Sequence, residues 1–204
     1  MENPLSEEEK IAKIEEHFTE ILSILGLDLS HGSIQKTPHR VAKMYVKEIF
    51  QGLNIDNFPR MTILEDPVST TAEKGGLIVS QCSFTSMCEH HLVPMIGKAY
   101  IGYIPNKKLL GLSKLNRIVR YFAARPQLQE RLTAQIVDSI RELTESEDIA
   151  CTVIAQHCCV LMRGVKDEKG ITTTNFFSGQ FKTDLARQKE FYHAMKTQSS
   201  YMAY

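Results

Sequence analysis

The sequence lacks any excess of charge. Its 204 residues include 24 Lys and Arg and 24 Asp and Glu, so the formal net charge at pH 7 is zero. A neutral chain creates no long-range field that would draw it onto nucleic acid or a membrane surface. We therefore expect neither nucleic acid nor membrane as a partner, and an anionic ligand would have to be held by a local cluster of cations.

The sequence also lacks long apolar runs and a secretion signal. No apolar segment approaches the ~20 residues that span a bilayer. The N-terminal stretch MENPLSEEEK is acidic, whereas a signal peptide is basic and then apolar. These absences predict a soluble, cytoplasmic protein. Cysteine is sparse and odd in number, with five residues, which in such a chain favours free thiols or metal ligands over a disulfide framework.

The first quarter of the chain has the spacing of helices. Apolar residues recur every three or four positions between Glu7 and Leu25, which predicts an amphipathic helix. A second helix is predicted to begin at Thr37-Pro38, a hydroxyl cap with proline at the first helical position, and to run toward Gly52. We therefore expect an N-terminal helical region at 1–55 and one further domain at 56–204.

The remainder is rich in β-branched and aromatic residues with helical stretches between them. Strands are predicted within 76–87, 92–105, 149–165 and 171–181, and two helices, divided at Arg125-Pro126, within 113–143. Strands grouped in pairs around a helical pair indicate an α+β fold with an antiparallel sheet, not a doubly wound parallel one. The C-terminal stretch KTQSSYMAY has no readable pattern and is expected to be merely exposed.

The stretch CEHH suggests a metal site. Cys88 and His91 are three residues apart, so one turn of backbone can present a thiolate and an imidazole to a single ion. The third candidate lies in QHCCV. If this segment is a strand, His157 and Cys159 share one face and Cys158 points to the other, so we predict Cys88, His91 and Cys159 as ligands. Sulfur and imidazole donors favour zinc.

Three protein ligands would leave a position for water, which is typical of a catalytic zinc site. The remaining imidazoles, His90 and His157, would then lie near the ion and be available for proton transfer. Two other interpretations stay open from spacing alone. One is a structural zinc with His90 or His157 as a fourth ligand, and the other is a set of ordinary buried thiols and histidines.

Several cations are candidates for binding an anion. Lys114 and Arg117 lie one helical turn apart just after the expected cap at Ser113, where free amide groups also favour anions. Arg163 would share the strand face of His157, and Arg40 follows the start of the second helix. The alternative is that these side chains are solvated surface.

Gln129 and Glu130 begin the second central helix. A carboxylate there either complements the helix dipole or accepts paired N–H donors, such as those of a guanine edge. The residues alone do not choose between these roles.

Four motifs, TPHRVAKMY, CEHH, GLSKLNRIVRYFAARPQLQERLT and HCCVLMRG, together resemble the GTP cyclohydrolase I family in content and order, from about Arg40 to Phe181. The resemblance implies that zinc is held by Cys88, His91 and Cys159, and that His90 and His157 transfer protons. It implies that Glu130, helped by Gln129, holds the guanine edge. The implied ribose and triphosphate contacts are Ser113, Lys114, Arg117, Arg163 and Arg40.

The resemblance also implies a reaction and an assembly. GTP and water would give 7,8-dihydroneopterin triphosphate and formate, the first step toward tetrahydrofolate and other pterins. Residues 56–204 would form a tunnelling-fold catalytic domain, whose units assemble into a β-barrel ring and a homodecamer with sites between subunits. Two features depart from the pattern expected for the family. They are a second thiol at Cys158 and the bulky stretch NFFSG.

Two other functions compete with this one. A related enzyme on the same scaffold would stop after ring opening or make another product from GTP. A zinc-stabilised GTP-binding regulatory protein would return GTP unchanged and would need a fourth protein ligand in place of the open position.

Overall fold

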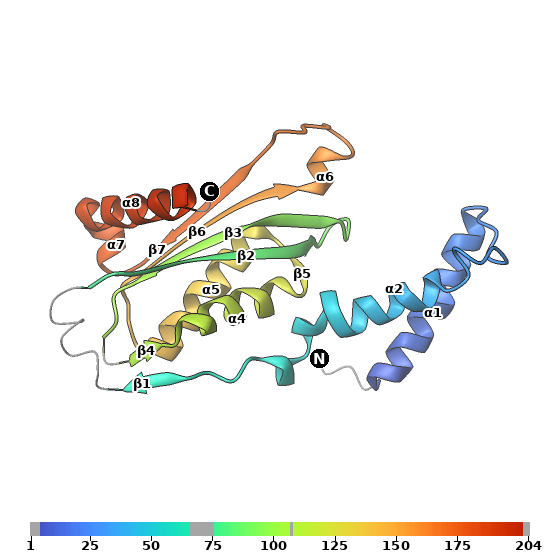
Figure 1. Cartoon of the computed structure of the whole chain (residues 1–204), viewed down its shortest axis with the longest axis horizontal. Coiled ribbons are helices and arrows are strands. Elements are labelled where there is room, and N and C mark those ends of the chain that lie inside the picture. The colour runs from blue at the N-terminus through green and yellow to red at the C-terminus, as the bar shows by residue number, and fades with distance from the viewer. Residues whose placement is uncertain (1–4, 66–75, 107, 202–204) are drawn as a thin grey trace.

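The computed structural model describes residues 5–65, 76–106 and 108–201. A twisted five-stranded sheet has helices on both faces, and a pair of helices stands out to one side (Figure 1). The longer helices are α1 (Glu7–Ile24), α2 (Thr37–Met44), α4 (Leu112–Ala123), α5 (Gln129–Thr144) and α8 (Leu185–Tyr201), and the short ones are α6 (Cys158–Leu161) and α7 (Gln180–Thr183). The strands are β1 (Ile63–Glu65), β2 (Ile78–Cys88), β3 (Pro94–Tyr103), β4 (Lys108–Leu110), β5 (Pro126–Gln127), β6 (Ile149–His157) and β7 (Thr172–Phe177).

The main sheet has the strand order β5-β2-β3-β6-β7. Its four long strands are antiparallel, as the sequence predicts, and the two residues of β5 pair in parallel with the end of β2. Met87 pairs with Pro94, and Met95 pairs with His157. The end of β2, the start of β3 and the end of β6 therefore meet at one end of the sheet.

The helical pair α4 and α5 covers one face of this sheet. Alternate residues of β2, such as Cys82 and Phe84, are buried toward it and join a core with Ile118 and Ile136. This alternation is the period-two pattern of a strand with one covered face. The predicted arrangement of an antiparallel sheet with a helical pair on one face is thus confirmed for a single chain.

The opposite face is covered in part by α8, which the sequence did not predict. Phe191 of α8 is fully buried beside Phe181 of α7. The Gln198 side chain donates to the Val79 carbonyl, and the Ser199 hydroxyl lies 2.7 Å from that of Tyr100. The predicted exposure of the C-terminal stretch holds for Lys196, Thr197, Ser199 and Ser200. The stretch is not merely exposed, because it continues α8 and is bonded to the sheet through Gln198 and Ser199.

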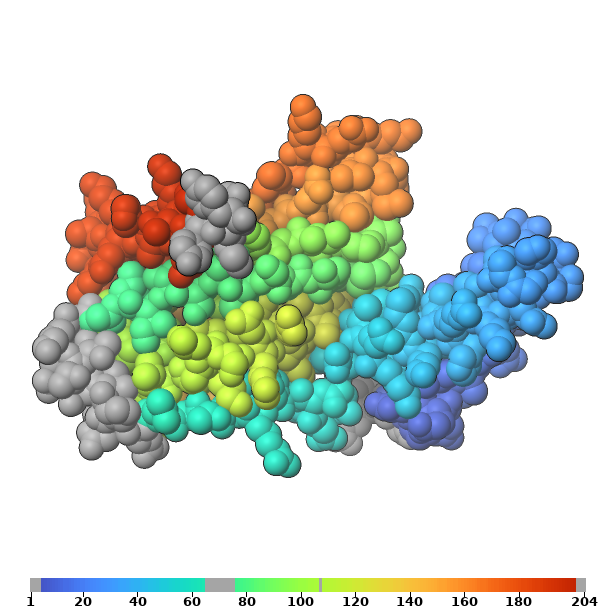
Figure 2. All heavy atoms as spheres, in the orientation of Figure 1, coloured from blue at the N-terminus to red at the C-terminus, as the bar shows by residue number. Residues whose placement is uncertain are grey.

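The N-terminal helices form an arm that stands clear of the main body (Figures 1 and 2). Helix α1 begins as predicted and carries a capping box, in which the Ser6 hydroxyl accepts from the Glu9 amide and the Glu9 carboxylate accepts from the Ser6 amide. Phe18 of α1 packs edge-on against Tyr45 at 5.5 Å between ring centroids. No residue of α1 is fully buried.

The predicted bounds of two of these elements are wrong in detail. Helix α2 starts at Thr37 and its α-helical part ends at Met44. The chain then forms a π-helical turn and two short 3-10 turns up to Asn57. The last strand stops at Phe177, because Gly179 has a left-handed φ of 52° and turns the chain into α7.

Within the described part of the chain, none of the helices is both long and apolar enough to cross a bilayer.

Candidate active site

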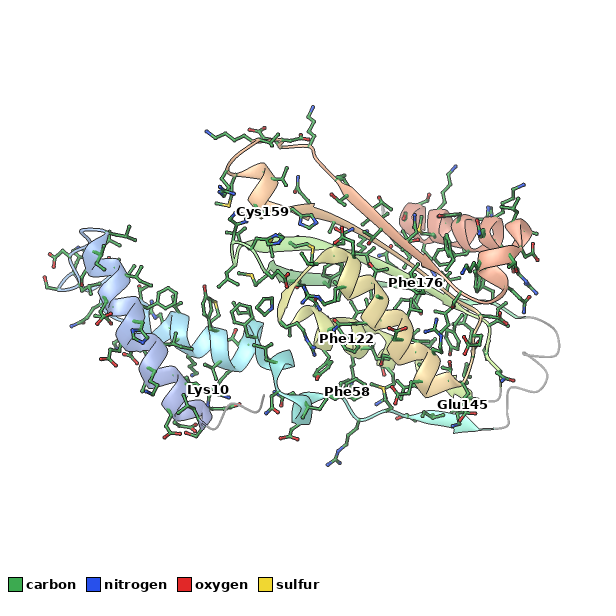
Figure 3. All side chains as sticks on the ribbon, turned by 180° about the vertical axis from the view of Figure 1, so that it is seen from behind. Lys10, Phe58, Phe122, Glu145, Cys159 and Phe176 are labelled. Carbon is green, nitrogen blue, oxygen red and sulfur yellow. The ribbon has the colours of Figure 1, made fainter. Side chains whose placement is uncertain are left out.

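Three possible metal-binding side chains converge at the end of the sheet where β2, β3 and β6 meet. One ligand atom from each of Cys88, His91 and Cys159 lies within 4.8 Å of the other two. Cys88 is the last residue of β2, His91 is in the following turn, and Cys159 belongs to α6, at the outer tip of the molecule (Figure 3). The structure thus brings together the three residues that the sequence predicted as ligands.

The turn after β2 is folded back on itself. The Cys88 amide donates to the Val93 carbonyl at 2.9 Å, and the Leu92 amide donates to the Cys88 carbonyl at 2.8 Å. Leu92 adopts a positive φ of 50°, which is uncommon for a branched residue and closes the turn tightly. This geometry returns His91 to the side of Cys88, so the two donors face one site.

Cys159 reaches the cluster for a different reason from the one predicted. The predicted strand through residues 149–165 ends at His157, and Cys158 to Leu161 form a helical turn. The pair Met95 with His157 is the last of the β3–β6 ladder, next to the start of β3 at Pro94. The strand-alternation argument for preferring Cys159 to Cys158 is therefore wrong, although Cys159 is the residue in the cluster.

The electrostatics of the cluster favour a bound cation. Burial raises the pKa of the Cys159 thiol, and the neighbouring Cys88 thiol raises it further through a hydrogen bond and through its charge. Two thiolates this close repel each other, and a divalent cation between them relieves the repulsion and stabilises the deprotonated form. Two sulfur donors and one imidazole are a donor set that suits zinc.

Two further side chains contact the cluster. His90 places Nδ1 3.9 Å from the Cys88 sulfur, and Arg163 places Nη1 2.9 Å from Nε2 of His91. A guanidinium is always protonated and only donates, so Nε2 of His91 is the acceptor in that contact. Arg163 thus lies in the site as predicted, although the strand that was expected to carry it there has ended.

The start of α5 forms one wall beside His157. Burial lowers the pKa of His157, and the negative charge of Glu130 opposes this in part. Gln129 is 2% exposed, and its Oε1 lies 2.7 Å from Nε2 of His157. Gln129 and Glu130 are the first two residues of α5, so the sequence located them correctly.

The other predicted anion contacts lie elsewhere in the chain. Ser113 is not the cap of α4, because the helix begins at Leu112 after Gly111. The backbone just before α4 is tied to the far end of β3, where the Leu110 amide donates to the Tyr103 hydroxyl. That end lies across the length of β2 from Cys88, about ten residues or roughly 30 Å away. The structure does not bring Ser113, Lys114 and Arg117 to the cluster of their own chain.

Lys114 and Arg40 have local surroundings of their own. The Lys114 ammonium donates to the Arg60 carbonyl at 2.9 Å, in the segment before β1. Arg40 is an exposed residue of α2 in the N-terminal arm, which stands apart from α6 (Figure 1). In a single chain, the predicted site residues therefore fall into separate groups.

The sequence did not identify the residues that anchor the CEHH turn. The Glu89 carboxylate accepts from the Arg131 guanidinium of α5, and the Glu89 amide donates to the Gln127 carbonyl of β5 at 3.1 Å. Charge and spacing gave no signal, because Glu89 and Arg131 are distant in the chain and each resembles ordinary surface. Their contact holds the turn against the start of α5.

Fold and cluster together define the class of the protein, a mixed helix–sheet protein with a Cys–His–Cys group at the end of its sheet that could hold a metal ion. Comparison with known proteins gives the family. The model of a family described as GTP cyclohydrolase I matches residues 14–196. The chain belongs to the GTP cyclohydrolase I family, which is a family of hydrolases.

Curated relatives agree with this assignment. The GTP cyclohydrolase 1 of Vibrio parahaemolyticus serotype O3:K6 is 50% identical over 194 residues, which are 95% of this chain and 88% of that protein. The enzyme of the same name from Aliivibrio salmonicida is 51% identical over 190 residues, 93% of this chain and 86% of that protein. The likeness thus extends over the N-terminal arm as well as the sheet.

Proposed function

We propose that this chain is a zinc-dependent GTP cyclohydrolase I, which converts GTP and water to 7,8-dihydroneopterin triphosphate and formate, the first step toward folate and other pterins. The observation that supports this most directly is the convergence of Cys88, His91 and Cys159 within 4.8 Å, with His90 and His157 close by, in a chain of this family. A hydrolytic ring opening needs an activated water and a proton donor, and this group of residues can provide both.

Cys88, His91 and Cys159 would hold the zinc ion. When bound by three protein ligands, zinc supplies a Lewis acid that lowers the pKa of a water molecule toward ~7, and so a nucleophile at neutral pH. These three residues fit a zinc ion with an open position, since among the described residues no fourth Cys, His, Asp or Glu ligand atom lies within 4.8 Å of all three ligand atoms.

His90 and His157 would move protons. Opening the five-membered ring of GTP adds water at C8 and requires a proton on the ring nitrogen that leaves. Release of formate from C8 takes a second water and a second proton transfer, and the later ring closure returns one water. Imidazole groups exchange protons near neutral pH. His90, beside Cys88, and His157, beside Glu130, flank the cluster from two different elements.

The substrate contacts would come from more than one subunit. Glu130 would hold the guanine edge, and Arg163 lies at the cluster itself. Ser113, Lys114 and Arg117 lie at the opposite end of the sheet of the same chain, so for them to bind the triphosphate of the same GTP a second copy must supply them. Arg40, in the arm, would likewise reach a neighbour's site.

The sheet edges support such an assembly. Among the residues that the structure describes, β2 is paired on its outer side only at Met87 and Cys88, and no strand pairs with the outer side of β7. Open edges of this kind are normally covered by further strands. Joining the β2 edge of one copy to the β7 edge of the next would close tunnelling-fold units into a ring, and two rings would make the homodecamer.

The test is to incubate the zinc-loaded protein with GTP and to follow formate release together with the mass of the nucleotide product. We expect formate and dihydroneopterin triphosphate in equal amounts. Formate with an unrearranged, ring-opened product would reassign the protein to a related reaction on the same scaffold. Intact GTP bound to zinc-loaded protein would contradict the proposal and favour a regulatory binding protein.

A further inference from the structure

The side-chain amide of Gln129 is wedged between His157 and the sheet. Gln129 is 2% exposed, and its Oε1 lies 2.7 Å from Nε2 of His157. One hydrogen bond must join these two atoms, and which of them donates depends on how the amide is oriented. The surroundings of the amide nitrogen decide this.

The nitrogen end of the amide faces only acceptors. Nε2 of Gln129 lies 3.0 Å from the Val153 carbonyl oxygen, 3.1 Å from that of Thr172 and 3.3 Å from the Thr174 hydroxyl. If the amide were flipped, its oxygen would face two carbonyl oxygens in a buried position, where an unsatisfied acceptor costs about 1–3 kcal/mol. The orientation with Oε1 toward His157 is therefore the stable one.

The hydroxyl protons around Gln129 support the same orientation. The Thr133 hydroxyl donates to the backbone carbonyl of Gln129 at 2.8 Å, so its proton is committed. In the 2.7 Å contact between the hydroxyls of Thr133 and Thr174, the proton must then come from Thr174. The Thr174 oxygen therefore remains available to accept from the Gln129 amide. The direction of each hydrogen bond in this group is thus determined.

We infer that Gln129 is a positioning residue that holds the His157 ring with its proton on Nε2 and leaves Nδ1 as the nitrogen available to substrate. Oε1 of Gln129 only accepts, so His157 must donate from Nε2, and a neutral imidazole carries one proton. The catalytic meaning of this bond rests on the proposed function, whereas the tautomer itself does not. In this arrangement the Gln129 amide is used within the protein and does not contact the guanine edge.

The arrangement fixes the ring from two sides of the fold. His157 is the last residue of β6 and immediately precedes the turn that carries Cys159, while Gln129 opens α5. Partners that orient metal-binding histidines typically change activity or metal affinity by about 10- to 100-fold when they are removed, and we expect an effect of similar size for a partner that orients a histidine beside the metal site. We therefore expect replacement of Gln129 to lower kcat.

The first test reads the tautomer directly. Solid-state 15N NMR of the zinc-loaded, 15N-histidine protein distinguishes the two ring nitrogens, and the His157→Gln variant identifies the His157 signals among the seven histidines. We expect a protonated Nε2 and an unprotonated Nδ1 in the wild type. In Gln129→Met we expect a mixture of tautomers. A wild-type proton on Nδ1 would overturn the inference.

The second test separates positioning from substrate binding. For Gln129→Met we expect kcat to fall at least about ten-fold, with KM for GTP within about two-fold of wild type and zinc content unchanged. A raised KM at unchanged kcat would overturn the inference, because it is the signature of a lost guanine contact. Thr174→Val, which removes one acceptor from the amide nitrogen, should shift kcat in the same direction by less, and it provides the test if Gln129→Met fails to fold.

Gln188→Met is the matched control, because the Gln188 amide also donates to a partly buried carbonyl, that of Phe181, on α7 at the foot of α8. Its kcat and its His157 spectrum should equal those of the wild type. A wild-type protein that carries the proton on Nε2 of His157 but releases no formate would support the inferred tautomer and refute the proposed function. Failure of the inference and failure of the proposed function therefore give different results.

Discussion

At the scale of the residue, the five cysteines fall into chemically different groups. None of the five forms a disulfide in the structure. Cys82 and Cys151 are fully buried on the sheet, and burial raises the pKa of Cys82 to about 11 and also raises that of Cys151. Cys88 and Cys159 face each other in the cluster, and Cys158 is the neighbour that lies outside it. Their reactivity should follow this division, because the thiolate is the reactive form.

In the zinc-loaded protein at pH 8, a thiol reagent should modify Cys158 alone. Cys82 and Cys151 stay protonated and buried, and Cys88 and Cys159 are held by the metal. Removing zinc with a chelator should make Cys88 and Cys159 reactive as well. Mass spectrometry of labelled peptides measures this, with Cys158→Ser as the control. Labelling of Cys82 in the native protein would contradict the burial argument.

Replacing a ligand should separate metal binding from proton transfer. Cys88→Ser or Cys159→Ser should lower zinc from about one per chain to near zero and abolish formate release, because two donors hold the ion poorly. His90→Ala should keep zinc and lower kcat by about 10²-fold or more. Atomic absorption measures the zinc content of each variant, and steady-state kinetics on the same samples measure kcat. A serine variant that lacks zinc and retains full activity would refute the assignment of the ligands.

At the scale of the element, the end of β6 controls where the site forms. Helices α1, α4 and α5 and strands β2 and β3 lie where periodicity predicted them, because local spacing and turn residues determine each of these elements. The extent of β6 was predicted wrongly, because it depends on where its partner β3 begins. Helix α8 was missed because its apolar residues do not form one clear face along the helix.

The β3–β6 ladder contains a position that only glycine fits. A Cβ at Gly97 would lie 2.3 Å from the Ile154 carbonyl oxygen and 2.6 Å from the Ala155 Cβ. Gly97→Ala should push β6 away from β3, destabilise the fold by about 1–3 kcal/mol and weaken zinc binding by displacing Cys159. Thermal unfolding and chelator competition measure the two effects.

Gly32→Ala is the control for this change, since a Cβ at Gly32 meets nothing within 4 Å. It should leave both the unfolding temperature and zinc affinity unchanged. If Gly97→Ala behaved in the same way as Gly32→Ala, the close approach of the two strands would not limit the position of the site.

At the scale of the whole molecule, the predicted substrate contacts are divided along the sheet. Cys159 and Glu145 mark its two ends (Figure 3), and the Lys108 ammonium bonds to the Glu145 carboxylate just before α4 begins. The metal cluster and the start of α4 are thus at opposite ends. A site that needs both must be shared between two copies of the chain. Two inactive variants should therefore complement each other.

Co-expression of His90→Ala and Arg117→Ala chains should restore activity that neither variant has alone. If each site takes its metal cluster from one chain and its phosphate contacts from another, random mixing gives about a quarter of the sites two native halves. Light scattering should give a mass of about ten chains, each of 23.2 kDa. Activity no higher than the mean of the two variants would show that each chain builds its site alone.

The sequence by itself determined which donors lie near one another along the chain. The Cys88–His91 spacing, the start of α5 at Gln129 and Glu130, and the helix and strand order all follow from local spacing and turn residues. Only the tertiary structure decided that Cys159 joins Cys88, that Gln129 bonds His157, and that α4 begins at the far end of the sheet. These depend on strand pairing and on packing between segments distant in the chain, and residue spacing within one element carries no information about either.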